Sequence, residues 1–365
     1  MFGLSKRTTA ALLVAAVTVL SFQLYVKFRS DGNPEDPPVT RIPAHVLPMP
    51  KAASTQLQDA IARSLEAPPA DGPPLPSPTD DWRPFITNVN RGGLEFTASA
   101  GSKFPDVQIV QSNIDGVATY TLIPGPIVQD NRNKLLIHFH GGAYVLFGGK
   151  AGLGEAIEMA HYTGMEVISV DYGMPPDHPF PSALDDAVTV WRYVLKSHSP
   201  ASVGFGGTSA GGGLTLAVVL RLKELGLPLP GALFCGTPWA DLKFQSDSLN
   251  VNEFVDDVLP TREGFLTAAA QLYAGSNDRA NPLISPIYGD FRNFPPTILV
   301  SGTRDLLLSD TVRVHRKLRH AGVDAELHVF EGLSHAEYLS LLDSPESIDA
   351  WTEIAKFFDS HLSPQ

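Results

Sequence analysis

From about residue 105 onward the chain alternates short apolar runs with longer amphipathic ones, and this rhythm limits the folds open to it. Six runs have the composition of buried strands: KLLIHF (134–139), EVISVD (166–171), SVGFGG (202–207), GALFCG (231–236), TILVSG (297–302) and AELHVF (325–330). The sequence also predicts helices at 182–197, 209–224, 309–321 and 345–361. Alternating strands and helices predict an α/β fold with a mostly parallel central sheet. The nearly uninterrupted apolar runs predict helices on both of its faces.

One predicted strand leads directly into a predicted helix through the segment FGGTSAGGG. Its Ser209 lies between Gly207 and Gly211, with only Thr208 and Ala210 as immediate neighbours. A Gly-x-Ser-x-Gly sequence between strand and helix is typical of a nucleophile elbow, a tight turn that holds the hydroxyl clear of the sheet. Glycines are needed there because a Cβ would clash, and the helix N-terminus favours negative charge. We predict that Ser209 is a nucleophile; a structural Gly-rich turn is the alternative.

A serine hydroxyl needs a base, and in enzymes with this elbow an Asp or Glu and then a His follow the serine in the chain. Asp305 comes three residues after the run TILVSG, whereas Asp310 stands beside Ser309 at the start of a predicted helix, where a capping role suits it better. Among the later histidines, His335 falls in a loop five residues after the run AELHVF. We therefore predict Asp305 as the acid and His335 as the base.

Acyl transfer also needs N–H donors for the developing oxyanion. One donor is expected to be the amide of Ala210, directly after the nucleophile, and the other should come from an early loop after a strand. The sequence HFHGGAY supplies that loop with His140, Gly141, Gly142 and Ala143. Its glycines keep side chains away from the amides. We expect His140 to brace the loop by hydrogen bonds rather than to transfer protons.

Four motifs together resemble the hormone-sensitive-lipase-like branch of the α/β-hydrolases, over residues 105–362. HGGA resembles the His-Gly-Gly-Gly oxyanion motif of that family, and GTSAGG resembles its Gly-Asp-Ser-Ala-Gly-Gly elbow. DYGMPPDHPFPSALDDAV (171–188) is similar to the segment Tyr-Arg-Leu-Ala-Pro-Glu-x-x-Phe-Pro-Ala, and TPWADL (237–242) is similar to Ser-Pro-Trp-x-Asp-Leu. The order of the four motifs makes the resemblance specific.

The resemblance implies an α/β-hydrolase fold and ester hydrolysis, with Ser209 as nucleophile, His335 as general base and Asp305 as its orienting acid. It implies a helical cap, built from residues 51–104 and from an insertion at about 243–290, over a catalytic domain of residues 105–362. Esters of short to medium acyl chain are the expected substrates. A lactone hydrolase and a non-catalytic ligand-binding homologue are the alternatives.

The same resemblance implies an oxyanion hole made by the amides of Gly142, Ala143 and Ala210, with Gly141 shaping the loop. Two departures from the family pattern matter. Thr208 replaces the usual Asp, which marks a Gly-Thr-Ser-Ala-Gly subgroup and leaves the triad untouched. Ala143 replaces the third Gly and narrows the loop by a methyl group, which puts bulky tertiary-alcohol esters in doubt.

The N-terminal segment 1–29 differs from the rest of the chain. Residues 8–26 form a stretch of 19 residues without charge, preceded by Lys6 and Arg7. At about 1.5 Å per residue a helix of this length spans a hydrocarbon core. No small-x-small cleavage site follows, so we favour an uncleaved membrane anchor over a secretory signal peptide. The Pro-rich residues 30–50 are typical of an extended linker.

After this linker, the segment 52–67 predicts a helix with one apolar stripe of Leu57, Ile61 and Leu65. The insertion 243–290 contains a further expected helix, TREGFLTAAAQLYAG.

The composition of the chain argues against some classes of partner and bound group. A net charge of −12 and a pI near 5.3 disfavour nucleic acid, because its phosphates would be repelled. One cysteine allows neither an intramolecular disulfide nor a cysteine-based zinc site. We expect no metal and no cofactor.

Overall fold

The computed structural model describes residues 46–66, 75–77, 80–125 and 131–363. Within them the chain forms an eight-stranded sheet in the order β1-β2-β4-β3-β5-β6-β7-β8. The strands are β1 (Gln108–Ile114), β2 (Val117–Ile123), β3 (Leu135–Phe139), β4 (Glu166–Val170), β5 (Val203–Thr208), β6 (Ala232–Gly236), β7 (Thr297–Gly302) and β8 (Ala325–Phe330). From β4 to β8 every neighbouring pair is parallel, whereas β2 pairs antiparallel with both β1 and β4. The predicted mostly parallel α/β architecture is confirmed.

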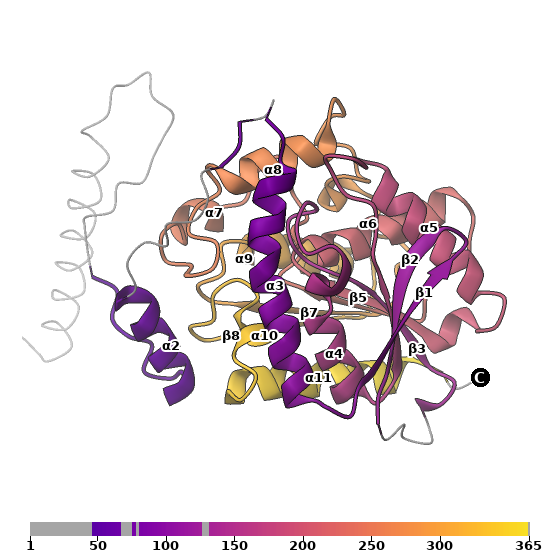
Figure 1. Ribbon diagram of the computed structural model, residues 1–365, viewed down its shortest axis with the longest axis horizontal. Coiled ribbons are helices and arrows are strands. Elements are labelled where there is room, and N and C mark those ends of the chain that lie inside the picture. Colours follow the sequence, from indigo (N-terminus) through magenta and orange to yellow (C-terminus); the bar gives the residue numbers. More distant parts are fainter. Residues whose placement is uncertain (1–45, 67–74, 78–79, 126–130, 364–365) are drawn as a thin grey trace, which may run out of the picture. The chain divides into compact units, whose positions relative to one another are not determined.

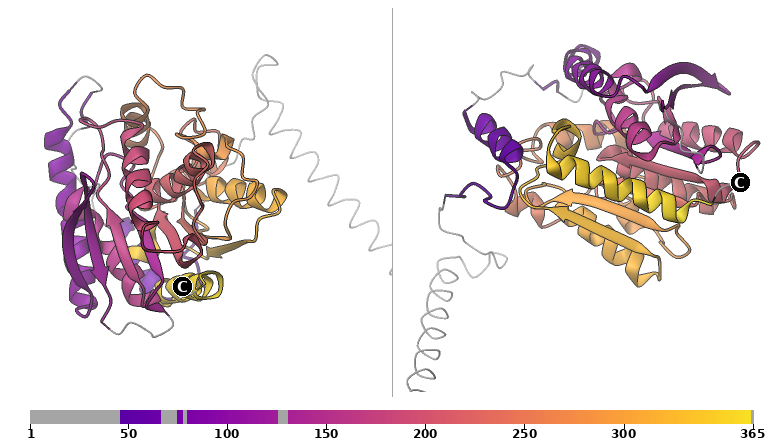
Figure 2. Two further views of the ribbon diagram at one scale, coloured as in Figure 1. Left: turned by 90° about the vertical axis from the view of Figure 1, so that its right-hand side faces the viewer. Right: turned by 90° about the horizontal axis from the view of Figure 1, so that it is seen from below.

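Helices cover both faces of the sheet (Figures 1 and 2). The helices of the described residues are α2 (Thr55–Glu66), α3 (Arg83–Lys103), α4 (Gly154–Thr163), α5 (Ser182–Val194), α6 (Ala210–Glu224), α7 (Ser248–Val251), α8 (Phe265–Ala274), α9 (Leu308–His320), α10 (Glu337–Ser340) and α11 (Pro345–His361). On one face α4 packs against α11, and on the other α5 packs against α6. The central strands β3, β5, β6 and β7 are buried along their whole length, and β4 is buried except at Glu166, which explains their nearly continuous apolar sequences.

The sheet topology brings the predicted site loops to one edge. The loop with the HGGA sequence follows β3, the Ser209 elbow follows β5, and the loops with Asp305 and His335 follow β7 and β8. These four strands are parallel, so their carboxyl ends meet at the same edge, where open α/β sheets bind ligands.

Two glycines let β5 and α6 approach β3 very closely. A Cβ on Gly207 would lie 2.0 Å from the carbonyl oxygen of Phe139, and a Cβ on Gly211 would lie 1.9 Å from the same atom. Both contacts are to backbone, which has no rotamer by which to move aside. The sequence expectation that glycine is needed on both sides of Ser209 is confirmed by this contact.

The N-terminal and edge regions differ most from expectation. Leu57 and Ile61 of α2 are buried, but Leu65 is 74% exposed, so the predicted stripe covers only the first turns of the helix. Helix α3 and the β1–β2 hairpin had no clear signal in the sequence. The predicted membrane span 8–26 lies outside the described residues; in the part of the chain that is described, no helix has the length and apolar character to cross a bilayer.

The Gly211 contact generates a stability prediction. Gly211→Ala should lower the free energy of unfolding by roughly 3 kcal/mol, because the methyl group must displace the β3 backbone. The matched control is Gly101→Ala in α3, where an added Cβ meets nothing nearer than 4.0 Å. That change should be neutral or stabilising by up to about 1 kcal/mol. Urea unfolding of both variants measures the difference, and equal stabilities would contradict the close-approach argument.

Candidate active site

Ser209 occupies a strained turn between β5 and α6. Its backbone has φ +62° and ψ −121°, a region that residues other than glycine rarely adopt. Two hydrogen bonds hold it there: Ser209 N–H donates to the carbonyl of Gly236 (2.8 Å), and Trp239 N–H donates to the carbonyl of Ser209 (2.9 Å). The end of β6 and the segment after it therefore fix the elbow. The side chain is partly exposed, as a hydroxyl that must meet a ligand requires.

Asp305 and His335 form a buried pair. His335 Nδ1 donates to Asp305 Oδ1 at 2.9 Å, and both residues are almost fully buried. The other polar contacts of the Asp305 carboxylate are Leu307 N–H to Oδ1 (2.8 Å) and Ser301 Oγ to Oδ2 (2.6 Å). The carboxylate can only accept from Nδ1, so the proton of the neutral imidazole is on Nδ1 and Nε2 is left as an acceptor.

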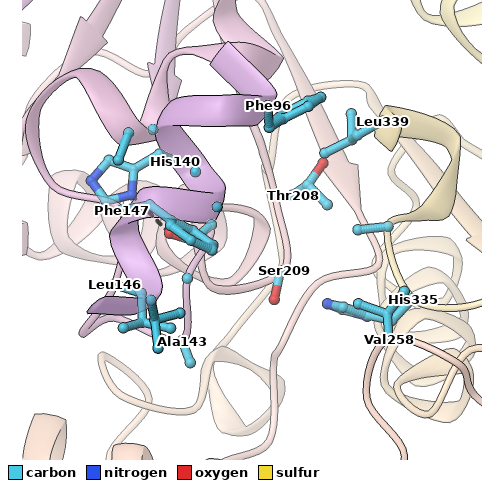
Figure 3. Close-up of a pocket in the computed structure, with 18 of the residues that line it drawn as sticks. Phe96, His140, Ala143, Leu146, Phe147, Thr208, Ser209, Val258, His335 and Leu339 are labelled. Carbon is cyan, nitrogen blue, oxygen red and sulfur yellow. Dashed lines mark hydrogen bonds between the residues drawn. The ribbon is translucent and has the colours of Figure 1, made fainter. Parts of the chain in front are cut away.

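The hydroxyl of Ser209 faces the ring of His335 across a cavity that both residues line (Figure 3). No hydrogen bond joins the two side chains in the described structure. Such bonds are often long in the absence of substrate and tighten when it binds. The structure thus brings the three predicted residues to one site, with the acid and base directly bonded and the hydroxyl opposite the free nitrogen.

Opposing effects set the protonation of His335. Burial lowers the pKa of the imidazole, but the charge of Asp305, its hydrogen bond to Nδ1 and the nearby charge of Asp256 together outweigh burial. The pKa of His335 is therefore raised above its ordinary value. A raised pKa makes the ring a stronger proton acceptor.

The loop after β3 has an unusual backbone, with two amides that are unpaired among the described residues. Gly142, Ala143 and Tyr144 have φ values of +100°, +54° and +63°, all in the left-handed region. The amides of Gly142 and Ala143 form no hydrogen bond within the described structure, and Ala210 N–H, at the first position of α6, has no acceptor inside the helix. Gly141 lies against the elbow, since a Cβ there would be 3.6 Å from the Cβ of Ser209.

His140 braces this loop and stays neutral. Its Nδ1 donates to the Gly141 carbonyl (2.7 Å), and its ring stacks on Tyr172 with centroids 4.2 Å apart. The Tyr172 hydroxyl donates to the carbonyl of His140 at 2.7 Å. Burial lowers the pKa of His140 to about 4. These contacts fit the expected bracing role.

The cavity measures about 560 Å³ and is lined mainly by apolar side chains. Helix α3 and the insertion 243–290 supply its outer wall: Phe85, Val89, Phe96, Val258, Leu259, Phe265 and Leu266. The rings of Phe85 and Phe265 lie 6.0 Å apart, so α3 and α8 meet over the strand ends (Figure 1). Within the described residues no group of three or more His, Cys, Asp or Glu side chains could hold a metal ion.

Comparison with known proteins agrees with this geometry. A family model described as alpha/beta hydrolase fold matches residues 136–339. The chain belongs to the hormone-sensitive-lipase-like branch of the α/β hydrolases. An esterase of Acinetobacter venetianus is 30% identical over 257 residues, 70% of this chain and 83% of the relative.

The chain is also similar to esterases of known structure. The crystal structure of an esterase called E25 is 42% identical with a TM-score of 0.85, covering 89% of this chain and 99% of that one. An esterase from the bacterial hormone-sensitive lipase family is 27% identical with a TM-score of 0.73, covering 86% of this chain and 100% of that one.

Part of this hydrolase's site had no signal in its sequence. Thr208 Oγ1 donates to Glu155 Oε1 and contacts the Tyr338 hydroxyl, each at 2.5 Å, while His138 Nε2 contacts Glu155 Oε2 at 3.1 Å. This buried polar chain links the elbow, helix α10 and strand β3 through Glu155 of helix α4. Asp256, in the insertion, is the other unforeseen residue. Glu155 and Asp256 belong to no spaced motif, and the motif that contains Thr208 does not show its partners, so only the folded structure reveals these contacts.

The predicted capping role of Asp310 is wrong. Its carboxylate is buried and makes no cap hydrogen bond to α9. Instead Oδ2 accepts from the amides of Ala240 and Asp241 at 2.9 Å each, and Oδ1 accepts from Ser246 Oγ. Ser309 Oγ likewise accepts from the amide of Ser248 at 3.0 Å rather than capping its own helix. Asp310 holds the segment after β6 in place and lies apart from His335.

The two histidines of the site, His140 and His335, should titrate at well-separated pH values. In nitrogen NMR of the ¹⁵N-labelled hydrolase, the midpoint for His335 should lie above about 6.5, because Asp305 outweighs burial. His140 should remain neutral until about pH 4. Asp305→Asn should lower the midpoint of His335 and leave that of His140 unchanged. A His335 midpoint below the ordinary value in the unmodified protein would contradict the charge balance described above.

Proposed function

We propose that this hydrolase cleaves carboxylic esters of short to medium acyl chain through an acyl-enzyme formed on Ser209. That it is a carboxylesterase-type hydrolase follows from its esterase relatives. The observation that carries the finer proposal is the arrangement of the strained Ser209 opposite the free nitrogen of a histidine bonded to Asp305.

In the first half-reaction Ser209 Oγ attacks the ester carbonyl carbon while His335 Nε2 takes the hydroxyl proton. The carbonyl oxygen becomes an oxyanion that accepts hydrogen bonds from the amides of Gly142, Ala143 and Ala210. Each such donor is worth about 3 kcal/mol of barrier reduction. When the intermediate collapses, the bond to the alcohol oxygen breaks and His335 gives its proton to the departing alcohol.

In the second half-reaction His335 takes a proton from water, whose oxygen attacks the acyl carbon. The oxyanion forms again at the same amides, and its collapse breaks the bond to Ser209 Oγ. The proton on His335 returns to Ser209, and the acid is released. Asp305 holds the imidazole in one tautomer and stabilises the imidazolium in both halves. The steps use only residues of this chain and water.

The size and lining of the cavity favour a substrate with an apolar acyl group of limited size. Its wall carries phenylalanine and aliphatic side chains from α3 and the insertion, and its volume is that of a small-ligand site. Lactones fit the same chemistry, since ring opening is the same attack on a cyclic ester. A purely ligand-binding role is disfavoured by the presence of all three residues of the triad.

A panel of p-nitrophenyl esters from acetate to palmitate tests this proposal. The full chain should hydrolyse the acetate to octanoate esters fastest, as expected from a cavity of small-ligand size and from its esterase relatives. Ser209→Ala should lower kcat/KM by roughly 10⁴-fold or more, since the triad acts as a unit. The substitution removes one exposed oxygen, so the unfolding midpoint should be unchanged or higher.

Two outcomes would count against the proposal. An active Ser209→Ala variant refutes the nucleophile, and a preference for acyl chains longer than decanoyl refutes the acyl-length assignment. A medium-ring lactone run beside the octanoate ester decides between the two substrate classes: faster turnover of the lactone would favour the alternative.

We also propose that residues 8–26 anchor the hydrolase in a membrane, with residues 30–50 as a spacer. The support is their sequence: length, absence of charge and the lack of a cleavage site. After carbonate washing the full chain should stay with membranes. Leu13→Lys with Val17→Lys should release it, because each charge costs about 3 kcal/mol at the centre of a span. A soluble full-length chain contradicts the anchor, and a chain shortened at its N-terminus indicates a signal peptide instead.

A further inference from the structure

Asp256 is a buried carboxylate in the insertion, in the loop that follows α7. It makes no contact with the cavity. Its oxygens instead accept from backbone amides, two of which belong to its own loop: Oδ1 accepts from Val258 N–H at 2.8 Å and from Leu259 N–H at 2.9 Å. Val258 and Leu259 line the cavity, so the carboxylate fixes part of the substrate wall.

The same carboxylate reaches both of the loops that carry charge in the proposed mechanism. Oδ2 accepts from Leu306 N–H, directly after Asp305, at 2.7 Å. His335 N–H lies 3.3 Å from each oxygen of Asp256. Four amides from three segments, two of which are 50 and 79 residues away along the chain, therefore converge on one side chain.

We propose that Asp256 is a positioning residue for the ester hydrolysis, which holds the loops of Asp305 and His335 at their working distance and adds a second negative charge beside the imidazole. This inference rests on the proposed function, because it assigns Asp256 a role through the triad. Asp256 is not a catalytic residue, since its oxygens are occupied by protein amides.

A carboxylate is suited to this place and an amide is not. Four N–H donors point at two oxygens, and an Asn in the same position would turn an NH₂ group toward some of those donors. A charged acceptor also makes stronger bonds to backbone amides than a neutral one. Two neighbouring hydrogen bonds also tie the insertion to the loops of Asp305 and His335: Asn252 Nδ2 donates to the carbonyl of Asp305 at 2.8 Å, and Asp257 N–H donates to Ser334 Oγ at 3.1 Å.

Asp256 affects His335 through its negative charge as well as through its hydrogen bonds. The charged groups that face the imidazole are Asp305, from the loop after β7, and Asp256, from the insertion, and both raise the pKa of His335. Glu337 begins helix α10, two residues after His335; its Oε2 accepts from Ser334 N–H at 2.9 Å, and the charge of Arg304 acts on its carboxyl. Burial raises the pKa of the Asp256 carboxyl, while His335 and the amides of Leu259 and Leu306 oppose this rise.

The experiment compares Asp256→Asn with Asp257→Asn in the full chain. The two changes remove the same charge one residue apart, but the Asp257 side chain is exposed. For each variant, kcat and KM on p-nitrophenyl butyrate are measured across pH, beside an unfolding curve. Asp256→Asn should lower kcat by roughly tenfold to a hundredfold with KM little changed, as misplaced reacting groups do. It should also move the acid limb of the kcat/KM profile to lower pH. Asp257→Asn should change neither.

A purely structural role would affect stability alone. Wild-type kcat and an unmoved acid limb in a folded Asp256→Asn variant would overturn the inference. If that variant does not fold, Asp256→Glu decides: it keeps the charge but is longer by a methylene, so it should keep the acid limb and still lower kcat. Wild-type kcat in that variant would likewise overturn the inference.

Ser209→Ala separates this inference from the function on which it rests. If Ser209→Ala is inactive while Asp256→Asn behaves as wild type, only the positioning role fails. If Ser209→Ala retains activity, the proposed function itself fails, whatever the Asp256 variants show.

Discussion

The approach of β5 and α6 to the end of β3 is the contact on which the site depends. Two positions without side chains, Gly207 and Gly211, meet the carbonyl of Phe139. The loop that begins at the next residue is thereby brought against the elbow, with Gly141 beside Ser209. The strained backbone of Ser209 persists because hydrogen bonds to the segment after β6 determine it from the other side. The hydroxyl and the free amides are therefore placed by the core of the fold rather than by flexible loops.

Asp305 and His335 are held differently from Ser209. Their loops follow β7 and β8, and β8 is the strand at the edge of the sheet. The insertion after β6 bonds both loops: Asn252 donates to the carbonyl of Asp305, and Asp256 accepts from the amides of Leu306 and His335. The same segment supplies part of the cavity wall, so the cover that encloses a substrate also holds the charged pair. In the proposed mechanism this arrangement would link the shape of the substrate to the geometry of proton transfer.

Sequence reasoning found what periodicity and local motifs encode. The strands β3 to β8, the helix after Ser209 and the loop positions of Asp305 and His335 follow from apolar runs and from glycine spacing. It could not find contacts made by isolated residues far apart in the chain. Asp256 lies in a polar segment with no period, Thr208 gave no sign of its partners Glu155 and Tyr338, and Asp310 had the position of a helix cap but bonds a distant loop. Helix α3 was hidden because two glycines interrupt its pattern.

The central claim is that one serine carries the acyl group. Mass spectrometry after treatment with a fluorophosphonate tests it most directly, because the reagent captures only a serine activated as a nucleophile. One adduct per chain is predicted, on the peptide that contains Ser209, with complete loss of esterase activity at the same stoichiometry. An adduct on another residue, or an unlabelled chain that continues to hydrolyse esters, would contradict the account.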